Sequence, residues 1–150
     1  MSGATFDYFL ALKVVKKQSP DVSRAEFLKN EADRGYKNLT IMIKKIEISD
    51  ENANDYIKMC YDIIAGAIRA KMLINGYSSS GFRAHEAEVS YLREIGFSEN
   101  DVQFADQLRY FRNGTLYYGT ALDKEYAEKV LEFLHRIYQS LKKKINLEMI

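Results

Sequence analysis

The apolar residues of this chain recur at steps of three and four over most of its length, which is the spacing of one face of an α-helix. A wide apolar stripe over residues 56–72 predicts the most buried helix, and the small pair Ala65-Gly66 within it would let a neighbouring helix approach closely. A long amphipathic pattern over residues 126–141 predicts the last helix. A further helix is predicted from a cap at Ser23 to about Ile46, with one apolar face at Phe27, Leu28, Ala32, Tyr36, Leu39, Ile43 and Ile46.

Turn and capping residues separate these patterns. A first short helix is predicted over residues 5–17, ending before Ser19-Pro20 because proline disfavours helical geometry in the residue ahead of it. Ser23 and Glu26 form a capping box for the second helix, and Asn75-Gly76 ends the third.

Two shorter helices are predicted after a polar loop at residues 78–80. One covers residues 85–96, and the other runs from Asn100 through Arg112. A capping box at residues 120–123 then begins the last helix. Since one proline and eight glycines are too few breakers for a many-stranded β protein, we expect an all-α fold, an antiparallel helical bundle of about five to six helices.

Composition narrows the class of protein further. A chain of 150 residues with 47% hydrophobic residues is expected to form a single helical domain over residues 1–150. The net charge of +1 provides no global field toward nucleic acid or membrane, so any anion site must be local. No apolar run is long enough to cross a bilayer and the first residues do not resemble a secretory signal, which predicts a cytoplasmic protein without a membrane partner.

Cysteine and histidine are scarce, and this limits metal chemistry. The one cysteine, Cys60, excludes an internal disulfide and a zinc site of paired cysteines, and its apolar surroundings predict a buried thiol. His85 and His135 are the two histidines, so a three-histidine metal site cannot form within one chain. We therefore expect neither a metal nor a cofactor.

Candidate chemistry is concentrated in LRYFRNGTLYYG, residues 108–119, which holds two arginines, an Asn-Gly pair and four aromatic rings. Arg109 and Arg112 are three residues apart and share a helix face, where they repel each other unless an acid or an anion lies between them. One interpretation is structural: Asp62 or Asp106 pairs with an arginine, and the tyrosines fill the core. The other is that a nucleotide or RNA is bound here, by Arg109, Arg112, Asn113, Tyr117 and Tyr118.

Three segments together resemble the HEPN family, the higher eukaryotes and prokaryotes nucleotide-binding domains. They are YDIIAGAIRAKMLINGY, RAHEAEVSYLREIG and LRYFRNGTLYYG. The resemblance covers roughly residues 54–145, with the helices of residues 5–46 expected to pack on this core. It implies a small helical bundle that forms a homodimer, often beside a nucleotidyltransferase in a toxin–antitoxin pair, and many members are metal-independent ribonucleases.

The nuclease motif of that family is an arginine, a polar residue and, after four to six positions, a histidine. Arg112 and Asn113 match its start, but Tyr117, Tyr118 and Gly119 stand where the histidine would be. Tyrosine, with an ordinary pKa of about 10, is a poor base at neutral pH. We therefore expect a dimeric HEPN-like nucleotide- or RNA-binding module with weak or lost nuclease activity.

Two alternatives stay open. The first is an active metal-independent endoribonuclease, in which Arg112 stabilises the charged phosphorane and Tyr117 or His85 transfers protons. The second is an interaction-only helical subunit that partners a nucleotidyltransferase, which the eleven tyrosines of the chain would suit because tyrosine is enriched at interfaces.

Overall fold

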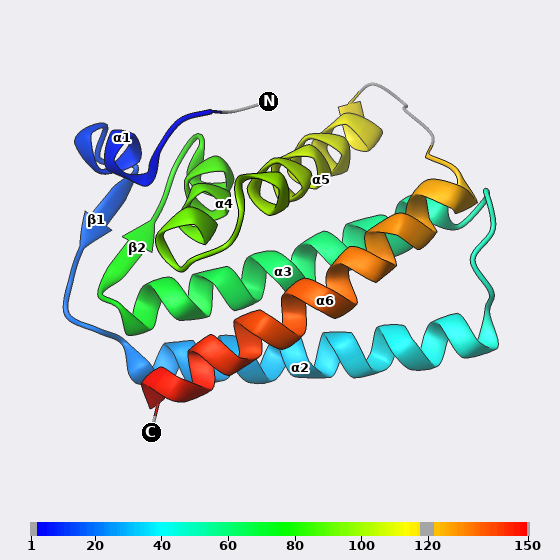
Figure 1. Cartoon of the computed structure of the whole chain (residues 1–150), viewed down its shortest axis with the longest axis horizontal. Coiled ribbons are helices and arrows are strands. Elements are labelled where there is room, and N and C mark those ends of the chain that lie inside the picture. Colours follow the sequence, from blue (N-terminus) through cyan, green and yellow to red (C-terminus); the bar gives the residue numbers. More distant parts are fainter. Residues whose placement is uncertain (1–2, 118–121, 150) are drawn as a thin grey trace.

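Figure 1 shows the computed structural model of the chain, which describes residues 3–117 and 122–149, and within these the side chains of residues 3–113 and 122–146. This described part contains six α-helices and two short strands. In chain order the elements are α1 (Phe6–Ala11), β1 (Val15–Lys17), α2 (Val22–Lys45), α3 (Ala53–Ile74), β2 (Tyr77–Ser79), α4 (Ala84–Glu94), α5 (Glu99–Tyr117) and α6 (Lys124–Met149). Helices make up nearly all of the regular structure, which confirms the predicted all-α bundle.

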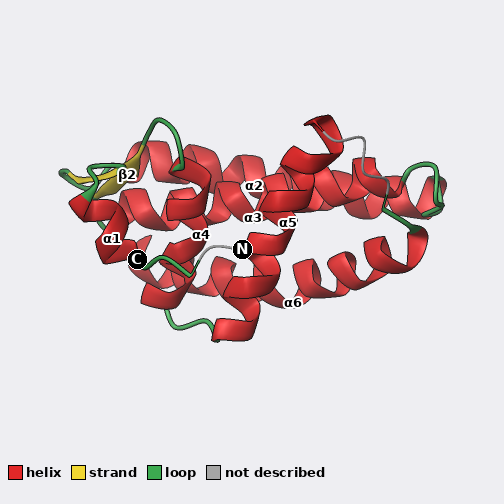
Figure 2. Ribbon diagram, turned by 90° about the horizontal axis from the view of Figure 1, so that it is seen from above, coloured by secondary structure: helices red, strands yellow, loops and turns green. Residues whose placement is uncertain are grey.

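Helix α3 is the centre of the bundle and packs against α2, α4, α5 and α6. Figure 1 shows it between α2 and the pair α4 and α5, and Figure 2 shows α6 on one side of the α2–α3 layer. Its residues Ile57, Ile64, Ile68 and Met72 are fully buried, as is Cys60. The expectation that this segment is the most buried helix is therefore confirmed. None of the described helices combines the length and apolarity that crossing a membrane requires.

Helix α2 lies along α3 and also contacts α6. A Cβ atom on Gly35 of α2 would lie 3.2 Å from Ile63 Cγ1 of α3, so a glycine is what lets the two helices approach closely here. The prediction placed this close approach at the pair Ala65-Gly66, and for Gly66 it is wrong, because a Cβ atom there would meet nothing within 4 Å. On the other side, the ring of Tyr36 stacks on Tyr138 of α6 with 4.8 Å between ring centroids.

The apolar face of α2 is narrower than the sequence pattern suggests. Its buried residues are Ala25, Ala32 and Leu39, which recur every seven positions. Phe27 and Ile46, predicted to face the core, have 60% and 58% of their surface exposed. A seven-residue step keeps a narrow seam toward one neighbouring helix, and positions beside the seam stay in solvent.

The first helix is shorter than predicted, because α1 ends at Ala11 and the chain then forms β1. β1 pairs antiparallel with β2, with Val15 opposite Ser79 and Lys17 opposite Tyr77. β2 overlaps residues 78–80, which were predicted to form a polar loop. The β-branched pair Val14-Val15 favours extended backbone, and a strand partner that is distant in sequence supplies the hydrogen bonds.

The helix ends are set largely by the expected residue types. Asn75 ends α3 and Gly76 follows with φ of +85°, as predicted. At the start of α2, however, the Asp21 carboxylate accepts a hydrogen bond from the Arg24 amide, so Asp21 is the cap in place of the predicted Ser23 and Glu26. At the start of α6, Asp123 accepts from the Tyr126 amide, and Thr120 of the predicted box lies outside the described residues.

Candidate functional site

A pocket of about 300 Å³ lies where α3, α4 and α5 meet. Four of the six predicted site residues line it: His85, Arg109, Arg112 and Asn113. Of the other two, Tyr118 and the side chain of Tyr117 lie outside the described residues. We call this the arginine pocket, and its full lining is Tyr61, Asp62, Ala65, Arg69, His85, Arg109, Arg112 and Asn113.

Helix α5 brings two of the arginines to the pocket. Arg109 Nε donates to Asp106 Oδ1 at 2.8 Å, one helical turn earlier, and the Asp106 side chain is almost completely buried. Arg112 Nε donates to Asp62 Oδ1 of α3 at 2.9 Å. Both arginines therefore have an acidic partner, as the structural interpretation proposed, and both also line the pocket.

The two arginine pairs differ in how they meet solvent. The Arg112 side chain is 34% exposed and that of Asp62 is 56% exposed. An ion pair this open contributes about 1 kcal/mol or less, because water and salt screen it. Asp62 thus orients the Arg112 guanidinium at the rim of the pocket without sealing it from an incoming anion.

Helix α4 brings His85 to the pocket and a buried carboxylate behind it. Glu88, whose side chain is 2% exposed, accepts from Arg69 Nε at 2.6 Å, Arg69 Nη2 at 3.0 Å and Ser79 Oγ at 3.1 Å. His85 Nδ1 lies 3.0 Å from the same carboxylate. An ionised carboxylate only accepts hydrogen bonds, so Nδ1 donates to Glu88 and Nε2 is the ring nitrogen left for another partner.

The hydrogen bonds to Glu88 keep it ionised despite its burial. Burial raises the pKa of this carboxyl, but the hydrogen bonds from His85 and Arg69 and the charge of Arg69 outweigh that effect and leave the pKa below its ordinary value of 4.5. Glu88 therefore holds Arg69 and His85 in place as an anion at neutral pH.

We expect acid to remove the stabilisation that ionised Glu88 provides. Because its pKa is lower in the folded chain than in the unfolded one, this stabilisation is fully present above pH 4.5 and is lost as the pH falls toward the folded-state pKa. The difference in unfolding free energy between the wild type and Glu88→Gln, from urea titrations at about pH 7 to about pH 3, should shrink below about pH 4.5. A difference that stays constant over this range would contradict the assignment.

The hydroxyl of Tyr61, on α3, is a buried polar group of the site. Its side chain is buried and lines the pocket, yet among the described residues its hydroxyl has no hydrogen-bond partner. Burial raises the pKa of Tyr61 well above its ordinary value, so the hydroxyl keeps its proton and can donate it. A buried polar group without a partner is unfavourable.

Three guanidinium groups, a histidine and a phenol therefore converge on one small space. Each guanidinium carries five N–H donors in a rigid plane, a shape that matches the oxygens of carboxylate and phosphate. Within the described part of the chain, no group of three or more His, Cys, Asp or Glu side chains is placed to hold a metal ion. The arrangement suits an oxyanion ligand of phosphate size.

Arg69 and Tyr61 were missed as site residues. A signal for Arg69 exists in the sequence, since it follows Asp62 by seven residues and the six residues between them carry no charge. Two helical turns bring such residues to the same face. Nothing in the sequence, however, shows that α4 and α5 cover this face.

No protein-family model matches the chain, and no curated protein matches it significantly. The resemblance to the HEPN family therefore stays a prediction made from the residues.

Proposed function

We propose that this chain is a HEPN-like binding module that holds a phosphate group of RNA or of a nucleotide in the arginine pocket. The observation that carries the proposal is the convergence of Arg69, Arg109 and Arg112 with His85 around one pocket of about 300 Å³. Arginine is the side chain best suited to grip phosphate through two parallel hydrogen bonds.

The charges of the site support a short-range mode of binding. Asp62, Glu88 and Asp106 balance the three arginines, so the pocket attracts a phosphate through directed N–H donors more than through net charge. Asp62 is the most exposed of the three acids, and it competes with an entering phosphate for Arg112. A bound phosphate then replaces Asp62 as the partner of Arg112. Glu88 and Asp106 remain buried and keep their contacts with Arg69 and Arg109.

Replacing Arg112 with alanine should weaken the binding of a short RNA or a nucleoside monophosphate about tenfold, because charge-assisted hydrogen bonds are lost. Isothermal titration calorimetry at low salt measures the affinity. Asp62→Asn should have the opposite effect, since it removes the competing carboxylate while keeping the shape of the side chain.

Arg136→Ala is a matched control for this experiment. Arg136 also forms a two-pronged pair with an aspartate of another helix, Asp101, at 2.7 and 3.1 Å, but it does not line the arginine pocket. Its loss should leave the affinity unchanged. Equal affinities of the wild type and Arg112→Ala would refute a role for this pocket in phosphate binding.

A second candidate, a metal-independent endoribonuclease, is favoured by the contact between His85 and Glu88. His85 Nε2 could accept the proton of an RNA 2′-hydroxyl, whose oxygen attacks the adjacent phosphorus. The bond from phosphorus to the 5′-oxygen then breaks, a proton passes to that oxygen, and the products are a 2′,3′-cyclic phosphate and a 5′-hydroxyl. Purified chain in EDTA should release such ends from a short RNA if this candidate is correct.

The family resemblance carries wider expectations about assembly. It implies a homodimer with a nucleotidyltransferase partner in a toxin–antitoxin pair. If the arginine pocket binds no phosphate ligand, the interaction-only subunit becomes the better proposal. Analytical ultracentrifugation and co-purification with an adjacently encoded nucleotidyltransferase would test these expectations.

A further inference from the structure

Helix α3 has one exposed stripe on its otherwise buried second half. From Cys60 to Ile74 the residues that are not buried are Asp62, Gly66 and Arg69. They follow one another at steps of four and three, so they lie on one face. An acid, a glycine and an arginine thus share the single accessible strip of the central helix.

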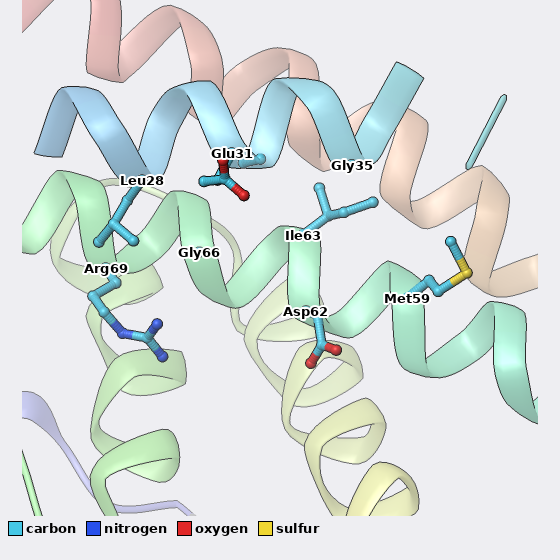
Figure 3. Close-up of a pocket in the computed structure, with 9 residues that line it drawn as sticks. Leu28, Glu31, Gly35, Met59, Asp62, Ile63, Gly66 and Arg69 are labelled. Atoms are coloured by element: carbon cyan, nitrogen blue, oxygen red, sulfur yellow. The ribbon is translucent and has the colours of Figure 1, made fainter. Parts of the chain in front are cut away.

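A second pocket, of about 420 Å³, lies on this strip between α2 and α3. We call it the apolar pocket, and its lining is Leu28, Glu31, Ala32, Gly35, Met59, Asp62, Ile63, Gly66 and Arg69. Figure 3 shows Leu28 and Glu31 projecting from α2, with Asp62, Gly66 and Arg69 along α3. Its size falls within the range of about 300–1,000 Å³ that is typical of small-molecule sites.

The two pockets adjoin because Asp62 and Arg69 line both of them. At about 100° per residue, these two side chains leave α3 in nearly the same direction. Met59, Ile63 and Gly66 lie to one side of that direction and line the apolar pocket, whereas Tyr61 and Ala65 lie to the other side and line the arginine pocket. A ligand that reaches across the helix can therefore occupy both.

Gly66 has no packing reason to be a glycine. A Cβ atom there would meet nothing within 4 Å, unlike at Gly35, where it would lie 3.2 Å from Ile63. Glycine is the poorest helix former after proline, and φ at position 66 does not require it. Because Gly66 has no side chain, its backbone is uncovered at the floor of the apolar pocket, where a planar ring of a ligand can lie on it.

We propose that the apolar pocket is a base subsite, so that the ligand is a nucleoside phosphate with its phosphate in the arginine pocket and its base over Gly66. This inference rests on the proposed function. The aliphatic side chains of Leu28, Met59 and Ile63 form the walls, which suits an unsaturated ring that leaves water.

Glu31 sets the preferred base. Its carboxylate lines the apolar pocket and is held by an ion pair with Arg34. A carboxylate only accepts hydrogen bonds. Guanine presents two neighbouring N–H donors on its pairing edge, whereas uracil presents one N–H between two carbonyl oxygens that would repel the carboxylate. The subsite therefore prefers guanine to uracil.

The test compares ligands that share a phosphate and differ in the base. Calorimetric titration of the full chain with GMP, UMP and ribose 5-phosphate should give the tightest binding for GMP. In Gly66→Leu the added side chain fills the floor, so the affinity for GMP should fall about tenfold, the size of a lost base contact, while that for ribose 5-phosphate is unchanged.

Two further variants keep the test decisive. Gly66→Ala adds one methyl group in open space and should raise the melting temperature while weakening GMP binding less than leucine does. Glu31→Gln should bring the affinities for GMP and UMP close together. If Gly66→Leu fails to fold, these two variants still test the floor and the base preference.

The outcomes separate the base subsite from the phosphate site. Equal binding of GMP and ribose 5-phosphate by the wild type, unchanged in the Gly66 variants, would overturn the base subsite and leave the proposed function standing. Failure of ribose 5-phosphate, GMP and RNA alike to bind would remove both. A guanine-containing pentanucleotide that binds much more tightly than GMP would identify RNA, in place of a free nucleotide, as the source of the base.

Discussion

Replacing Glu88 with alanine is expected to lower the free energy of unfolding by about 3 kcal/mol, the lower end of what breaking a buried ion pair costs. The lower end applies because Arg69, with 34% of its side chain exposed, can regain some water when its partner is removed. The variant also loses the acceptor that Ser79 of β2 and His85 share. Urea denaturation at neutral pH measures the change.

An exposed pair of the same chemistry provides the control. Arg93 and Glu99 form a two-pronged contact with both distances at 2.8 Å, but the Glu99 side chain is 60% exposed. Glu99→Ala should therefore destabilise the fold much less than Glu88→Ala. Similar losses for both variants would mean that burial does not make Glu88 special, and its role as the support of Arg69 and His85 would have to be abandoned.

The helices could be predicted from sequence because their signals are local. The stripe of α3 and the stop at Asn75-Gly76 depend on residues within a few turns of each other, and both were predicted. The pairing of β1 with β2 could not be predicted, because Val15 and Ser79 are far apart in sequence. Neither segment shows the alternation of apolar and polar residues that marks a longer strand. The same limit explains Phe27, whose exposure depends on where α2 meets its neighbours.

The part of the candidate site that lies on a single helix could be predicted from the sequence. Arg109, Arg112 and Asn113 belong to one segment, and their shared face follows from helical spacing. His85 was a candidate from another segment, but its contact with Glu88 and its place beside Arg112 are tertiary facts. Arg69 was missed because its place in the arginine pocket depends on α4 and α5 covering the face of α3 that carries it.

Central placement of α3 also explains how one helix serves both core and site. Its buried residues fix its position against four neighbouring helices, so the exposed strip of Asp62, Gly66 and Arg69 is held rigidly. Sites on rigid elements keep their geometry better than sites on loops. Changes at Asp62 or Gly66 should alter ligand binding with little effect on folding, whereas changes at Arg69 or Glu88, which form the buried ion pair, should alter both.

Replacing His85 with asparagine is expected to reduce RNA cleavage by about 100-fold to about 10,000-fold if the chain is a ribonuclease, because that is the usual contribution of a general acid or base. The asparagine amide can still donate to Glu88, so the variant removes the titratable nitrogen and keeps the buried carboxylate partnered. The measurement is the single-turnover rate on a short RNA in EDTA, with the cyclic phosphate product identified by mass spectrometry.

His135→Asn is the matched control for that experiment. His135 is also an exposed histidine with Nδ1 in a hydrogen bond, to the Tyr36 hydroxyl, but it does not line the arginine pocket. Its replacement should leave the cleavage rate unchanged. Tyr117→Phe separates the remaining alternative, because a rate that falls in this variant and not in His85→Asn would assign proton transfer to the tyrosine. Full activity in both variants would exclude both residues from proton transfer.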